Sequence, residues 1–163
     1  QQKLYRLYLS YPPEWLEHQA KALFADVLTA RFIGYVHDLI FHLRDKGVNV
    51  VLLSSNLDII TKQYGRYFGV EDMGVSLKKI QHEQTADRQY FRDFKANALQ
   101  AFDRKNTLAV ADSIYDMPVF EHAEHCLIVT KRIEKWMTKV SQRFVIRTST
   151  ESHPLMEPTA NAQ

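Results

Sequence analysis

The feature that most constrains the fold is a series of short apolar runs separated by helical patterns. Residues 48–53, 108–111 and 126–129 are rich in Val, Leu, Ile and Ala and contain almost no polar residue. Runs of this length without apolar and polar alternation are typical of strands buried on both faces, as in a parallel sheet. Between them, apolar residues recur every three or four positions, as in amphipathic helices. The sequence therefore predicts an α/β fold with a mostly parallel sheet.

Breaks in the pattern divide the chain into three parts. Residues 1–46 are mainly helical and end in a charged turn followed by Gly47, a common helix stop. Residues 47–147 form the predicted α/β core, with helices expected at 57–68, 90–102, 118–123 and 133–140 and extended segments at 73–80 and 144–146. Residues 148–163 are rich in Thr, Ser, Glu, Pro and Asn, a composition typical of a disordered tail.

Composition argues against several functional classes. The 163 residues carry 21 Lys and Arg against 19 Asp and Glu, a net charge of +2, so no global field attracts nucleic acid. No apolar run approaches the roughly 20 residues of a membrane span. The lone Cys126 fits a reducing, cytoplasmic location. One basic cluster lies near the C-terminus, and we interpret it as a solvated helix face and not as a nucleic-acid patch: Lys131, Arg132, Lys135, Lys139, Arg143 and Arg147.

A second cluster has the residue types of a transition-metal site. His122, His125 and Cys126 lie within five positions of one another. Cys126 also opens a predicted buried strand, and free Cys is among the most buried residue types. We therefore expect Cys126 to pack in a buried strand and do not predict a metal site there.

Polar residues follow two of the predicted strands at the points where the strands end. Ser54 follows the first run and Asp112 the second, with Asp116 four positions further on. In open α/β sheets, ligands bind beyond the carboxyl ends of the strands. A hydroxyl and backbone amides at a helix N-terminus suit phosphate, and two carboxylates on a tight loop suit Mg²⁺. Lys95 lies between them in sequence and is a cation suited to a phosphoryl group.

Each of these residues also has an ordinary structural interpretation. A Ser after a strand is more often a helix cap, and an Asp pair before a helix more often interacts with its dipole. Their order and spacing are more specific. Residues 47–55, Lys95 and residues 109–118 resemble motifs two, three and four of the haloacid dehalogenase (HAD) superfamily, and within it the phosphoserine phosphatase-like branch. The likeness spans about residues 14–147 and implies a Rossmann-like core with helices on both faces, preceded by part of a helical cap.

The resemblance also implies roles for individual residues. Ser54 would hydrogen-bond the transferring phosphoryl group, assisted by the amide of Ser55, and Lys95 would neutralise its charge. Asp112 would ligate Mg²⁺ directly, and Asp116 would support the metal. The catalytic set is then Ser54, Lys95 and Asp116, the phosphate set Ser54, Ser55 and Lys95, and the metal set Asp112 and Asp116.

One motif of the family has no match in this sequence. Members use the first Asp of an Asp-x-Asp-x-Thr motif as nucleophile, on a strand between those ending at Ser54 and Asp112. The nearest candidate, residues 26–29, has one Asp where two are needed and lies in a helical pattern. Without that strand, two sheet edges would face each other unpaired. We expect a missing N-terminal segment or a complementing chain to supply it, and we expect this chain alone to be inactive.

Two functions follow from these observations. The first is an Mg²⁺-dependent phosphatase of a small phosphorylated metabolite that works through an aspartyl-phosphate. The alternative is a catalytically inactive HAD-like protein that binds phosphate and Mg²⁺ or has a regulatory role. Nucleic-acid binding through the basic cluster ranks last because it lacks exposed aromatic stacking platforms.

Overall fold

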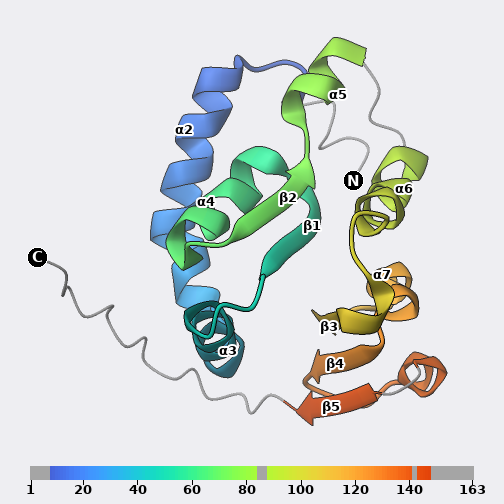
Figure 1. Ribbon diagram of the computed structural model, residues 1–163. Helices are drawn as coiled ribbons and strands as arrows, with labels where there is room; N and C mark the ends of the chain where they lie inside the picture. The colour runs from blue at the N-terminus through green and yellow to red at the C-terminus, as the bar shows by residue number, and fades with distance from the viewer. Residues whose placement is uncertain (1–7, 84–87, 141–142, 148–163) are drawn as a thin grey trace, which may run out of the picture.

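A computed structural model describes residues 8–83, 88–140 and 143–147 of the chain (Figure 1). The predicted tail, 148–163, lies outside these residues. The helices are α2 (Pro13–Leu23), α3 (Gly34–Asp45), α4 (Asp58–Phe68), α5 (Leu77–Glu83), α6 (Arg88–Leu99) and α7 (Met117–His122). The strands are β1 (Val51–Leu57), β2 (Glu71–Val75), β3 (Leu108–Ala111), β4 (His125–Thr130) and β5 (Arg143–Arg147). None of the helices in this part of the chain combines the length and hydropathy needed to cross a membrane.

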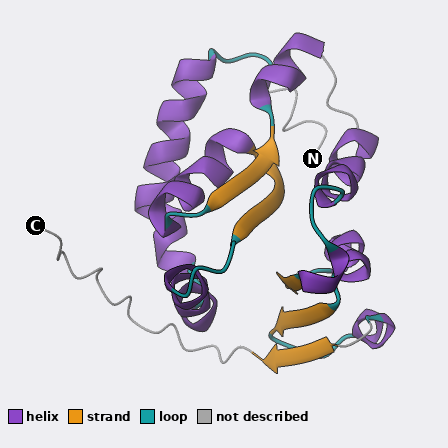
Figure 2. Ribbon diagram, in the orientation of Figure 1, coloured by secondary structure: helices purple, strands orange, loops and turns teal. Residues whose placement is uncertain are grey.

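The five strands form two parallel sheets. One has the order β1-β2 and the other β3-β4-β5 (Figures 1 and 2). All pairings are parallel, which confirms the predicted α/β class. In the described residues, β1 and β3 each pair on one side only, and no ladder joins them. The sheet is therefore divided at the position where the sequence predicted a gap.

Helices cover the smaller sheet on both sides. In Figure 1, α2 and α4 lie to the left of β1 and β2, and α6 lies to the right. A buried cluster joins α2 to the sheet and to α5: Leu16, Ala20, Leu57, Ile59, Val75, Leu77 and Ile80. Helix α6 contacts β1, β2 and α7. Helix α6 therefore links the smaller sheet to helix α7, which packs on the larger sheet.

The larger sheet has a core of its own. Cys126 and Ile128 of β4 are fully buried, and the rings of Phe120 and Trp136 stack with centroids 6.0 Å apart. The Cys126 thiol donates to the carbonyl of Phe120, and burial raises the pKa of this thiol. His122 Nε2 lies 2.9 Å from the carbonyl oxygen of Phe102. These contacts confirm that Cys126 packs in a buried strand.

An aromatic cluster joins α3 and α4. His37 is 8% exposed, and its Nε2 lies 3.1 Å from the hydroxyl of Tyr67. Around this pair pack the rings of Phe24, Phe32, Phe41, Tyr64 and Phe68. Helix α4 is followed by Gly69, whose φ of +67° lies in the left-handed region that glycine adopts without steric cost.

Three predicted elements differ from the structure. Strand β1 begins at Val51 and continues through the polar residues to Leu57, because Leu57 still pairs with Val75. Residues 77–80, predicted to be extended, begin helix α5, because the Ser76 hydroxyl accepts the Lys79 amide as a helix cap. The helix predicted at 133–140 is the shorter 3-10 segment Lys135–Lys139.

Candidate active site

A buried ion pair lies between α6 and the turn that follows β3. The ammonium of Lys95 contacts Oδ1 of Asp116, and the two side chains are only 14% and 10% exposed. These residues are 21 positions apart in sequence. Because a charge that leaves water needs a partner, each of the two residues stabilises the other in this position. The structure thus brings together two of the predicted catalytic residues.

Local hydrogen bonds shape the turn that carries Asp116. The Ser113 hydroxyl accepts the Tyr115 amide at 3.2 Å, and the Asp116 amide donates to the Ser113 carbonyl at 2.9 Å. Pro118 occupies the first turn of α7, as predicted, where its missing N–H has no helical partner to lose. The turn therefore directs Asp116 inward, while Tyr115 is 84% exposed.

Asp112 lies at the entrance to this turn, directly after the last residue of β3. It is exposed and makes no hydrogen bond or ion pair with the described residues. Oδ2 of Asp116 also has no hydrogen-bond partner among them. One open carboxylate and part of a second fit Mg²⁺, which takes few protein carboxylates and completes its shell with water and phosphate. In the described ranges, no group of three or more His, Cys, Asp or Glu forms a protein cage for a metal.

Ser54 and Ser55 lie inside β1, in an irregular stretch of the strand. Leu53 pairs with Met73 and Leu57 pairs with Val75. An advance of four residues along β1 therefore matches an advance of two residues along β2. This is a bulge, in which the Ser54 hydroxyl accepts the Asn56 amide at 3.1 Å. The expectation that Ser54 and Ser55 open a helix is therefore wrong, because α4 begins at Asp58.

Asp58 has a larger structural role than the sequence indicated. Its Oδ1 accepts the amides of Ile59 at 2.8 Å and Leu77 at 3.1 Å. One carboxylate therefore joins the N-termini of α4 and α5 at the carboxyl ends of β1 and β2. An acid in the first turn of a helix is favoured by the helix dipole, but no local sequence pattern indicates the contact of Asp58 with a helix 19 residues away.

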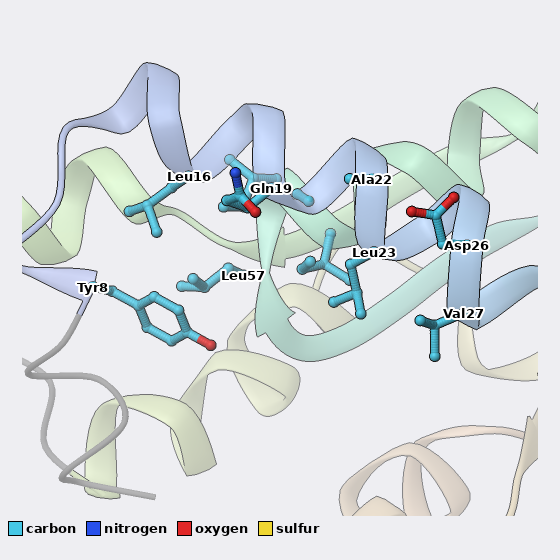
Figure 3. A pocket seen from close by; sticks show the side chains of 11 residues that line it. Tyr8, Leu16, Gln19, Ala22, Leu23, Asp26, Val27 and Leu57 are labelled. Carbon is cyan, nitrogen blue, oxygen red and sulfur yellow. The ribbon is translucent and has the colours of Figure 1, made fainter.

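A pocket beside this junction was also not predicted. It lies between α2, the π-helical turn Phe24–Leu28 and the start of α4, and has a volume of about 340 Å³ (Figure 3). Asp26, considered and rejected as a nucleophile from sequence, is on the π-helical turn and lines this pocket. It does not follow a strand.

The sequence that forms these elements matches a family model. The family model of haloacid dehalogenase-like hydrolases matches residues 1–121 of the 163. This chain belongs to that family. The matched range of the HAD-like hydrolase includes both Ser residues of the bulge, Lys95, Asp112 and Asp116, and it confirms the resemblance at the level of the superfamily.

Proposed function

We propose that this HAD-like hydrolase is an Mg²⁺-dependent phosphatase of a small phosphorylated metabolite, in the phosphoserine phosphatase-like branch of its family. The observation that carries the proposal is the buried Lys95–Asp116 pair beside the open carboxylate of Asp112. A cation and a metal-binding carboxylate at one strand end supply what phosphoryl transfer requires, namely positioning and neutralisation of charge.

Each residue has a distinct part in this proposal. Asp112 and Asp116 would hold Mg²⁺, which neutralises phosphate oxygens when bound. Lys95 is oriented by Asp116 and directs its ammonium to the phosphoryl group. The hydroxyl of Ser54 and the amide of Ser55 would hydrogen-bond the phosphoryl oxygens. In the bulge, the Ser54 hydroxyl accepts from Asn56 and so keeps its own proton for donation to phosphate.

The nucleophile is proposed to come from outside this sequence. An aspartate oxygen would form a bond to phosphorus while the ester P–O bond breaks and the leaving alcohol takes up one proton. Water would then hydrolyse the aspartyl-phosphate, releasing inorganic phosphate and restoring the carboxylate. The separate edges of β1 and β3 support the proposal, because one parallel strand between them would satisfy both and end beside Asp112. A preceding segment or a complementing chain would supply it.

One observation favours a second candidate function. The sequence contains no Asp-x-Asp-x-Thr motif to supply a nucleophile, while the residues proposed to bind phosphate and Mg²⁺ are present. A catalytically inactive phosphate-binding or regulatory protein would have these properties.

Calorimetry on the 163-residue chain tests the binding part of the proposal. We expect inorganic phosphate to bind more tightly with Mg²⁺ than without it, and Asp112→Asn to lose most of this Mg²⁺ effect because the open carboxylate is gone. Glu121→Gln is the matched control, since it removes one exposed carboxylate from the neighbouring helix α7. Equal Mg²⁺ effects in the wild type and Asp112→Asn would contradict the metal assignment.

Turnover distinguishes the two candidate functions. The product of the native gene should hydrolyse p-nitrophenyl phosphate in the presence of Mg²⁺, and the 163-residue chain alone should not. Binding of phosphate and Mg²⁺ with no turnover by the native product would favour the inactive binding protein.

A further inference from the structure

The pocket beside α2 has the walls of a ligand site. Its volume of about 340 Å³ lies at the lower end of the usual range for small-molecule pockets. Leu16, Ala20, Leu57 and Ile59 are each at most 7% exposed and form its inner wall. In Figure 3, the side chains of Leu16, Leu57 and Tyr8 converge on the same space. The inner part of the pocket is therefore apolar and belongs to the packed core.

The pocket also has polar lining groups. These are Gln19, Asp26 and the hydroxyl of Tyr8, and Asp26 is the only acidic residue among the lining residues. Asp26 is also exposed, so its carboxylate borders the opening and not the inner wall. An apolar inner wall with a carboxylate at the opening favours a ligand that has an apolar body and a cation or hydrogen-bond donor at one end.

The backbone at the rim departs from regular helix. Helix α2 ends at Leu23, and Phe24–Leu28 continues as a π-helical turn. π-helical turns are rare in proteins, but those that do occur are often found at functional sites. They change the direction in which side chains leave the helix. Here the turn carries Asp26 and Val27, both of which line the pocket. This irregularity is independent of the shape of the pocket and points to the same place.

The pocket is also close to the proposed phosphate site. Leu57 of its inner wall is three residues after Ser54 on β1. At about 3.4 Å per residue, the two Cα atoms are at most about 10 Å apart. The inner wall of the pocket and the Ser54 bulge therefore lie within the length of one small molecule of each other.

We propose that this pocket holds the leaving group of the substrate, an apolar chain or ring with an amine or similar donor directed to Asp26. The inference rests on the proposed phosphatase function. It identifies the substrate class as phosphomonoesters of amphipathic, cationic or neutral alcohols, and it disfavours those with a second anionic group near Asp26.

Binding of unphosphorylated probes to the full chain tests the pocket by itself. In NMR titrations, we expect n-hexylammonium to bind more tightly than n-hexanol, and n-hexanol more tightly than n-hexanoate, with shifts at Leu16, Ala20 and Leu57. Ala22→Phe fills the pocket and should weaken hexanol binding by about tenfold, while Ala25→Phe, an exposed position outside the lining, should not. Asp26→Asn should remove the preference for the cation. Equal binding by the two Phe variants, or no binding of any probe, would overturn the pocket assignment.

Alkyl phosphates test the link to the phosphate site. With Mg²⁺ present, affinity should rise from ethyl to butyl to hexyl phosphate, by roughly fourfold for each methylene that becomes fully buried. Ala22→Phe should remove this dependence on chain length and leave ethyl phosphate binding unchanged. Hexanol binding with no dependence on chain length among the phosphates would overturn the substrate role of the pocket. Hexanol binding with no phosphate binding at all would overturn the phosphatase proposal as well, so the two failures are distinguishable.

Discussion

Among single residues, Lys95 and Asp116 depend on each other most strongly. Lys95→Met would leave the carboxylate of Asp116 buried without a cation, and breaking a buried pair in this way costs about 3 to 5 kcal/mol. We expect a loss of about 3 kcal/mol in the free energy of unfolding, measured by urea denaturation. The double variant Lys95→Met with Asp116→Asn should recover more than half of this loss, because no buried charge remains.

Two outcomes would count against this interpretation. A loss below about 1 kcal/mol in Lys95→Met would mean that water reaches Asp116 and that the pair acts like an exposed one. Additive losses in the double variant would mean that the two side chains do not interact. Lys105→Met is the matched control, since this lysine is exposed and has no ion pair with the described residues.

The sequence was informative for these residues because their environment is local. Asp112 and Asp116 follow a strand that the structure confirms residue for residue, and Pro118 marks the helix start. Ser54 was placed at a helix N-terminus because the apolar run stops at Leu53. The strand continues because pairing with β2 resumes at Leu57, a contact between segments that no local pattern reveals.

At the scale of elements, α4 and β2 are held close by glycine. A Cβ at Gly74 would lie 2.6 Å from the Cα of Asp58, in the backbone of the facing helix. The three atoms nearest to a Cβ at Gly65 would all belong to the Asp72 side chain, with Oδ2 at 2.5 Å and Cβ at 2.9 Å. We expect Gly74→Ala to destabilise the fold by about 3 kcal/mol, since backbone cannot move aside cheaply.

Gly65→Ala is the comparison. Rotation of Asp72 moves its carboxylate away but leaves its Cβ 2.9 Å from the new methyl group, so β2 must give way slightly. Alanine gains up to about 1 kcal/mol of helix propensity over glycine, so the net loss by thermal or urea unfolding should be smaller than in Gly74→Ala. Equal losses in the two variants would mean that α4 shifts as a unit and that the close approach at Gly74 does not fix its position.

Elements that depend on distant contacts were the ones that the sequence missed. Helix α5 follows β2 where an extended segment was predicted, and its first amide is held by Asp58, 19 residues earlier. The pocket likewise forms between α2 and the start of α4, which are adjacent only after folding. Apolar periodicity predicted both helices but not the space between them. The division at 46/47 stays a prediction, although α2 shares a buried cluster with β1, β2 and α5.

At the scale of the whole molecule, the main feature is that the parallel strands form two separate sheets. The resemblance to the family implies a strand between β1 and β3, and in the described residues these two strands belong to separate sheets. Because a strand in a parallel ladder directs alternate amides to its two neighbours, about half of the amides in β1 and β3 lack a strand partner. Leu108, at the start of β3, is 46% exposed, unlike the residues of a fully covered strand.

Hydrogen exchange of the 163-residue chain measures this division directly. Strand β4 lies between β3 and β5, so both sets of its amides are paired and should exchange only on global unfolding. Alternate amides of β1 and β3 should exchange at least about a hundredfold faster, since their opening does not require unfolding. Equal protection of β1, β3 and β4 in a dilute monomer would contradict the divided sheet. Protection that grows at β1 and β3 when a strand-forming segment is added, and leaves β4 unchanged, would place that segment in the gap beside Asp112.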